Sequence, residues 1–468
     1  KRQGNRWGFF PSVSAAWRIS EENFFKNSSI SSWFSNLKLR ASYGMMGDDN
    51  LGGLYPDFAY LSGYTYYKGQ SLMPDDPFSS VKSKKVIGSA PKGIPVTTIS
   101  WMKIKLMNVG IDFGFFDNRL TGEFDLFKRM RDGIPGTPSD IMFPLETGLS
   151  ALPENMNSDM TVGFDAFVKW NDKVGDLKYS VGANITFARQ KNGKRHGEIF
   201  GNAWDKYRWA QSNRWSNVVL NTDQGNAGGV WMWEVIGRFE TQEQIDSYPV
   251  DQDGQNNATV RPGDVILRDV NGDGIINDFD ERPQAYASAD WPWDSSTSNK
   301  NPLISMGINL GFEWKGFDVA ADFAGGFKNT FVADWDLKWG VTRSVNGYYY
   351  NNIDVWRHED IFDPKSPWIP GKFPALRGQE SHSGRWWNSF YTREVNYLRL
   401  RNLVVGYSLP KNWIRKVGME QCRIYFQGTN LFCLSSLHDY GFDPEISTVN
   451  GQDYPQHKVL TLGVNVKF

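Results

Sequence analysis

The chain has 468 residues, and its 51 lysine and arginine residues nearly balance its 52 aspartate and glutamate residues. A dedicated nucleic-acid-binding protein carries a strongly basic surface, so we expect no nucleic-acid partner. The mean hydropathy is −0.50 and no run of 18 apolar residues occurs, which excludes a protein that crosses membranes with helices. Aromatic residues make up 15% of the chain and glycine occurs 46 times, a composition that favours an all-β protein.

Alternation of apolar and polar residues predicts strands along most of the chain. From Ile304 to Trp314, for example, apolar side chains alternate with mostly small or polar ones. Each run spans about ten residues, the length with which a tilted strand crosses a bilayer, whereas strands of soluble sheets usually have about five or six. The predicted strands begin or end near Phe9, Leu37, Met107, Leu120, Thr161, Leu177, Leu303, Phe317, Val395, Cys422 and Leu460.

The predicted connections alternate in length. Tight turns fall at residues 117–118, 171–176 and 315–316, whereas long polar stretches such as residues 190–302 join other strands. Short turns on one side of a membrane and long loops on the other are typical of outer-membrane barrels.

Further features refine this interpretation. We expect the links at residues 20–36 and 410–420 to be partly helical, and a change of phase near Arg401 and Asn402 indicates a bulge. Barrels place aromatic girdles at the ends of their strands, and aromatic residues end several runs here. They are Trp17, Phe116, Trp170, Tyr179 and Trp314.

Six groups of residues carry a resemblance to a known family: 6–14 with 16–18, 37–44, 118–122, 397–402, 406–410 and 428–432. Together and in this order they resemble barrel signatures of the SusC/RagA family of TonB-dependent transporters. The resemblance implies a transmembrane barrel of the 22-stranded type in the cell outer membrane, with an internal plug. It also implies energy from the TonB complex, a SusD-like surface lipoprotein as a lid, and import of oligosaccharides or peptides rather than catalysis.

Residues 1–468 are expected to form only the C-terminal portion of such a barrel. About eleven strands can be counted, and no plug, TonB box or N-terminal β-sandwich extension is recognisable. We therefore expect the plug and the N-terminal half of the barrel to be a separate or cleaved piece, or part of a longer chain. The first and last strands would then pair with strands outside this chain, because unpaired edges are costly in lipid.

The predicted loop region 190–302 contains a twelve-residue calcium-loop pattern that runs from Asp269 to Asp280. Oxygen ligands recur at the required spacing and Gly274 stands where the loop turns sharply, so we expect Ca²⁺ to pin this loop. An ordinary turn rich in asparagine, aspartate and glycine is the alternative. The expected ligands are Asp269, Asn271, Asp273, Ile275 through its carbonyl, Asn277 and Asp280.

Tryptophans crowd the predicted loops. Aromatic faces stack on sugars and other apolar ligand surfaces, and tryptophan is enriched at interfaces, so these residues are candidates for contact with substrate or lid. Packing within the loops is the alternative, and we favour it for most of them. The candidates are Trp204, Trp209, Trp215, Trp231, Trp233, Trp335, Trp339, Trp386 and Trp387.

Catalytic signals are poor, because no histidine, serine or cysteine motif of a known enzyme class occurs. By resemblance to other outer-membrane proteins, the final strand that ends at Phe468 is the segment that the barrel-assembly machinery reads. Two alternatives remain open. A secreted, tryptophan-rich protein that binds or cleaves glycans would be soluble without detergent, and a passive porin would conduct ions without TonB.

Overall fold

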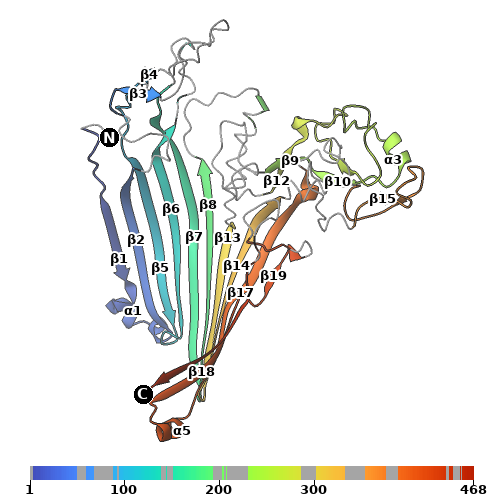
Figure 1. The fold of residues 1–468 in the computed structure, drawn as a ribbon. Coiled ribbons are helices and arrows are strands. Elements are labelled where there is room, and N and C mark those ends of the chain that lie inside the picture. The colour runs from blue at the N-terminus through green and yellow to red at the C-terminus, as the bar shows by residue number, and fades with distance from the viewer. Residues whose placement is uncertain are drawn as a thin grey trace, which may run out of the picture.

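The structure, a computed structural model, contains one large antiparallel sheet (Figure 1). It describes residues 4–49, 60–67, 88–91, 94–136, 138, 144, 151–192, 203–204, 207, 230–285, 302–332, 354–375, 388–438, 442–445, 454 and 456–468. Eleven strands follow one another in chain order across the sheet, and a short twelfth strand, β19 (Cys433–Ser435), pairs with β17. The eleven are β1 (Ser12–Arg18), β2 (Phe34–Asp48), β5 (Met102–Phe115), β6 (Leu120–Gly136), β7 (Glu154–Val174), β8 (Leu177–Asn192), β13 (Ile304–Trp314), β14 (Phe317–Val332), β17 (Thr392–Ser408), β18 (Gln421–Thr429) and β20 (Val459–Lys467).

This topology confirms the predicted all-β fold and the predicted number of strands. Among the strands that the structure describes, β1 pairs only with β2 and β20 only with β18, so both are edges of the sheet. The first described residues lie at the end of the sheet that carries the long connections, and the C-terminus lies at the other end (Figure 1).

The two faces of the sheet differ in polarity, as the alternation predicts. Residues directly opposite each other on paired strands share a face, so Ile308, Phe323 and Leu400 form one continuous apolar row. This face is open to the surroundings: Leu310 is 38% exposed and Phe312 44%. A soluble sandwich would bury such a face, whereas a barrel turns it toward lipid.

Several strands are longer than the alternation predicts. The runs indicate about ten residues, but β6 has 17 and β7 has 21. Their extra residues lie beyond the apolar belt, where the pairing continues between polar side chains such as Arg131 and Asp159. An apolar–polar period marks only the part of a strand that has one apolar face, so it underestimates the length.

The end of the sheet near the C-terminus carries the short connections. Between β13 and β14, Lys315 and Gly316 have φ values of 46° and 92°, which suit a two-residue hairpin turn. The two links predicted to be partly helical contain short helices, and no helix among the described residues is long and apolar enough to span a membrane. These helices are η1 (Ile19–Glu21), α1 (Asn23–Lys26), η2 (Ser29–Ser32), α5 (Lys411–Ile414) and η9 (Arg415–Val417).

Aromatic side chains gather at this end of the strands. The rings of Trp33, Phe34 and Phe115 stack on one another, with centroids 4.4–5.9 Å apart. Trp17 is 49% exposed and Trp314 48% exposed at the ends of their strands, as the sequence predicts. Wide, exposed rings at one level of a barrel are typical of the boundary between hydrocarbon and water.

The predicted bulge in β17 is confirmed. Asn402 lies opposite Asp322 and Leu400 lies opposite Phe323, so Arg401 is an extra residue without a partner in the pairing between β14 and β17. The shift keeps the apolar residues of β17 on the apolar face at both ends of the strand, because Leu403 pairs with Ala321 on the far side of the bulge.

At the opposite end, residues 230–285, 354–375 and 388–391 form a compact unit that we call the loop module (Figure 1). It has its own apolar clusters, one around Trp233 and Leu267 and one around Phe239 and Ile245. Two further short strands, β3 (Tyr64–Tyr67) and β4 (Gly88–Pro91), pair antiparallel as a separate two-stranded sheet. The elements of the module are β9 (Val230–Met232), β10 (Val235–Arg238), α3 (Gln242–Asp246), β11 (Val265–Leu267), η5 (Asp278–Asp280), β12 (Arg282–Ala285), β15 (Arg357–His358), β16 (Trp368–Ile369) and η8 (Ser389–Tyr391).

Candidate functional site

Charged side chains on the polar face of the sheet pair mostly from strand to strand. Arg40 of β2 contacts Asp112 of β5 at 2.7 Å and Asp125 of β6 at 2.9 Å. Arg423 of β18 pairs with Asp318 of β14, and the two side chains pass over Gly406 of the strand between them. A Cβ at this glycine would lie 2.6 Å from both the Arg423 Nε and an Asp318 oxygen, so the pair depends on the missing side chain.

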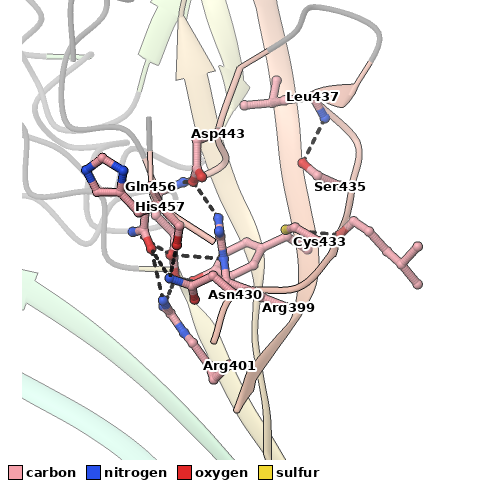
Figure 2. Close-up of polar contacts among 12 residues, drawn as sticks. Arg399, Arg401, Asn430, Cys433, Ser435, Leu437, Asp443, Gln456 and His457 are labelled. Atoms are coloured by element: carbon pink, nitrogen blue, oxygen red, sulfur yellow. Dashed lines mark hydrogen bonds and ion pairs between the residues drawn. The ribbon is translucent and has the colours of Figure 1, made fainter. Parts of the chain in front are cut away.

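Arg399 and Arg401 on β17 depart from this pattern. The wall beside them is built of small residues, because Arg399 lies opposite Ala324, which in turn lies opposite Gly307. Their carboxylate partners, Asp443 and Glu445, come instead from the connection between β19 and β20. These four charges form the candidate site (Figure 2).

The candidate site is an ionic network that is buried at Arg399 and open to water at Arg401. Arg399, whose side chain is 4% exposed, contacts Asp443 Oδ1 at 2.6 Å and Glu445 Oε2 at 3.3 Å. Arg401 pairs with the other oxygen of Glu445, which also accepts a hydrogen bond of 2.9 Å from the Tyr397 hydroxyl. Two guanidinium groups and two carboxylates therefore compensate one another, with Arg399 buried and Arg401 36% exposed.

Amide side chains complete the network (Figure 2). Gln456 donates to Glu445 Oε2 at 3.1 Å and accepts a hydrogen bond of 3.3 Å from Arg401. Asn430 donates to Gln456 and to the carbonyl of His457, both at 3.3 Å. The start of the final strand is thereby tied to the same point of β17 as Glu445.

An apolar contact holds the same connection further along β17. Leu437 is 1% exposed and packs with Phe331 of β14 and Val395 of β17, while Phe442 packs against this cluster. Because Val395, Tyr397 and Arg399 share one face of β17, residues 436–438 and 442–445 cover that face, and we call these residues the strap. The strap has an apolar anchor at Leu437 and an ionic anchor at Asp443 and Glu445.

The predicted calcium loop lies within the loop module, and its side chains fold back on their own backbone. Both oxygens of Asp269 accept hydrogen bonds, from the N–H groups of Gly272 and Gly274. Asp273 accepts from the N–H of Ile275 at 2.9 Å and from the amide of Asn271 at 2.9 Å. These bonds hold the pKa of Asp273 below its usual value, so this exposed carboxylate stays ionised.

The last residue of the pattern faces the other way. Asp280 is fully buried and accepts hydrogen bonds of 2.9 Å from the N–H groups of Val270 and Asn277. Within the part of the chain that the structure describes, no group of three or more histidine, cysteine or acidic residues is placed to hold a metal ion. The turn therefore brings Asn271, Asp273 and Asn277 together but keeps Asp280 on the backbone.

The structure places three of the candidate tryptophans. Trp233 is 8% exposed in a core of the loop module, and its indole N–H donates to the Asn277 carbonyl at 2.8 Å. Trp204 stacks on Tyr207 at 5.2 Å and meets Phe279 at 5.3 Å. Trp231 lies in β9, whereas other candidates fall outside the described residues: Trp209, Trp215, Trp335, Trp339, Trp386 and Trp387.

Sequence reasoning did not single out Arg399 and Arg401 as a site. Their signal was a strand in which Tyr397, Arg399 and Arg401 alternate with leucine, which places charge on one face. Asp443 and Glu445 lie 44 residues further along the chain than the arginines they bind. No local pattern joins residues at that distance, so the network becomes visible only in the fold.

Comparisons with known proteins agree with the fold. The chain is 24% identical over 476 residues to the TonB-dependent receptor SusC of Bacteroides thetaiotaomicron, covering 99% of the chain and 40% of the receptor. A TonB-dependent receptor of Formosa agariphila is 23% identical and is covered to 43%. The solved RagAB peptide transporter superposes with a TM-score of 0.65 at 21% identity, over 100% of this chain and 44% of the solved chain. No protein-family model matches.

The fold and its two faces identify the chain as part of a large antiparallel transmembrane β-barrel. Along almost its whole length the chain is similar to the TonB-dependent receptor SusC and to the RagAB transporter, as the sequence motifs indicate. It spans less than half the length of these relatives.

Proposed function

We propose that this chain forms part of the barrel of a TonB-dependent importer in the bacterial outer membrane. The observation that carries the proposal is the exposed apolar face of the sheet, backed by a polar face rich in ion pairs. This division suits a wall with lipid on one side and a hydrated lumen on the other. The relationship to SusC-type receptors supports the same function.

The partners are part of the proposal. β1 and β20 pair with strands outside this chain, and these strands belong to a polypeptide that also carries the plug on which TonB pulls. A SusD-like lipoprotein closes the extracellular mouth over the loop module. The cargo is an oligosaccharide or a peptide: the family resemblance implies both classes, and the similar RagAB structure is that of a peptide transporter. Native mass spectrometry of the purified protein is expected to find a second polypeptide or one longer chain.

Transport and location test the proposal directly. The protein is expected in outer-membrane fractions, and uptake of its cargo should stop when TonB is deleted. Uptake that continues without TonB would identify a passive porin. Protein that stays soluble without detergent would identify a secreted glycan-binding or glycan-cleaving protein.

A matched pair of variants on β20 tests which face meets lipid. Leu462 lies on the apolar face and is 78% exposed, whereas Asn465 lies on the polar face of the same strand. An arginine on the lipid face costs about 2–4 kcal/mol near the middle of a bilayer and much less in the lumen. Leu462→Arg should therefore lower the amount of folded protein in the membrane, while Asn465→Arg should not. Equal effects would contradict the assignment of the faces.

We further propose that Ca²⁺ binds the loop from Asp269 to Asp280. The oxygens of Asp269, Asn271, Asp273 and Asn277 and the carbonyl of Ile275 suit a hard cation in number and type. Asp280 joins them only by giving up its hydrogen bonds to Val270 and Asn277. Trp233, which bonds to the Asn277 carbonyl, is a reporter at the loop, so its fluorescence should change when Ca²⁺ is added.

A further inference from the structure

Among the residues that the structure describes, Arg399 and Arg401 pair with carboxylates of the strap and with none on a neighbouring strand. Arg40 and Arg423 find their carboxylates on the wall itself, so their pairs persist whatever the loops do. The described carboxylate partners of Arg399 and Arg401 are on the strap. Lifting the strap would therefore leave two positive charges side by side on the lumenal wall.

Two neighbouring arginines without their carboxylate partners have the chemistry to bind an anion. Guanidinium groups donate several hydrogen bonds in a fixed plane, which suits carboxylates and sulfates, and charge-assisted bonds are stronger where water is largely excluded. Tyr397 and Gln456 add donors that now serve Glu445. On the neighbouring strands β14 and β13, the residues beside Arg399 are Ala324 and Gly307, and neither has a large side chain that would crowd a bound ligand.

We propose that Arg399 and Arg401 form an anion-binding subsite of the lumen, which Asp443 and Glu445 of the strap fill until an anionic group of the cargo displaces them. The inference rests on the proposed import function, since it assigns the subsite to cargo. The group is a carboxylate or a sulfate, which an acidic peptide or an acidic glycan can each supply. Neutral cargo does not open the strap.

The strap can exchange its ionic anchor without leaving the wall. Leu437 is buried in the apolar cluster with Val395, and Ser436 donates to the carbonyl of Glu394 at 2.8 Å. Arg401 is 36% exposed, Asp443 20% and Glu445 15%, so an anion arriving from water meets the network at Arg401 and Asp443 first. The apolar anchor is a pivot, and the two carboxylates are the part that moves.

Small dianions test the subsite without a known cargo. Glutarate presents two carboxylates, propane-1,3-disulfonate presents sulfate-like groups, and glutaramide is the neutral analogue. Each is titrated into the purified full-length protein in detergent, where neither TonB nor a lipoprotein is needed. Failure of import and failure of the subsite are thereby distinguished.

Variants of the strap test whether binding of the dianion depends on Arg399 and Arg401 or only on the overall charge of the polar face. Asp443→Asn combined with Glu445→Gln should tighten the binding of glutarate by at least about tenfold, because the competing carboxylates are gone. When Arg399→Gln and Arg401→Gln are added to this variant, the increase in affinity for glutarate should disappear. Asp322→Asn is the matched control, because it removes a charge from the same face but faces Asn309. It should leave the affinity unchanged.

Hydrogen–deuterium exchange gives a second measurement on the unaltered protein. Glutarate should speed exchange at residues 442–445 and leave β19, anchored to β17, unchanged. If the variant Asp443→Asn with Glu445→Gln binds only glutarate more tightly, the subsite is assigned to carboxylates. If it binds only the disulfonate more tightly, the subsite is assigned to sulfates. Three results would overturn the proposal: the strap variant binds glutaramide more tightly by the same factor as glutarate, Asp322→Asn also tightens the binding of glutarate, or glutarate leaves the exchange of residues 442–445 unchanged.

Discussion

Replacing Gly263 by alanine should loosen the loop module. Gly263 has a φ of 91°, and a Cβ there would lie 2.7 Å from the Cβ of Trp356, which is 6% exposed. The left-handed backbone costs alanine about 1–2 kcal/mol. Forcing a methyl group against a packed side chain costs about 1–3 kcal/mol more, so the two effects together destabilise the module by about 2–5 kcal/mol.

Gly254 supplies the matched control. Its φ is 70°, but nothing lies within 4 Å of an added Cβ, so Gly254→Ala incurs only the backbone cost of about 1–2 kcal/mol. Hydrogen–deuterium exchange of residues 354–375 measures the difference, because the contact with Trp356 joins them to the rest of the module. Exchange there should rise far more in Gly263→Ala than in Gly254→Ala. Equal exchange in the two variants would refute the predicted contact between Gly263 and Trp356.

Three further predictions concern the calcium loop, the pH response of the module and assembly. Asp273→Ala should abolish the response of Trp233 fluorescence to Ca²⁺, and an unchanged titration would argue against the loop as the site. Burial raises the pKa of Asp253, but donors from Thr259, Gln255 and Asn257 outweigh it and hold that pKa far below its usual value. The carboxylate therefore stabilises the module above its unfolded-state pKa of about 3.9, and this stability is lost as the pH falls toward the folded-state pKa. Thermal unfolding of the module should show that loss below about pH 4, and Asp253→Asn should remove the dependence. Deleting Phe468, which is 80% exposed after β20, should lower the amount of heat-modifiable protein in the outer membrane; unchanged levels would count against an assembly signal.

The sheet could be predicted from sequence because each strand carries its own evidence. Alternation is a local property, so even the bulge at Arg401 is visible as a change of phase. The polar extensions of β6 and β7 were not predicted because they lack an apolar face.

The loop module and the candidate site could not be predicted in the same way. A core of the module joins Trp233 to the segment at Asn388 and Ser389, more than 150 residues away in the chain. The partners of Arg399 lie in a connection with no period of its own. Such contacts depend on which strand ends the folded sheet brings together, and no local sequence pattern shows this.

The separate cores of the loop module have an evolutionary consequence. The clusters around Trp233 and Phe239 contain no described residue of the large sheet, and the module contacts β17 where the hydroxyl of Thr392 donates to the sulfur of Met232 at 3.1 Å. Substitutions, insertions or an exchange of the whole unit can therefore accumulate without altering the pairing of the strands. Selection for new cargo can act on the module while selection for membrane insertion acts on the wall, so the two parts are free to diverge at different rates.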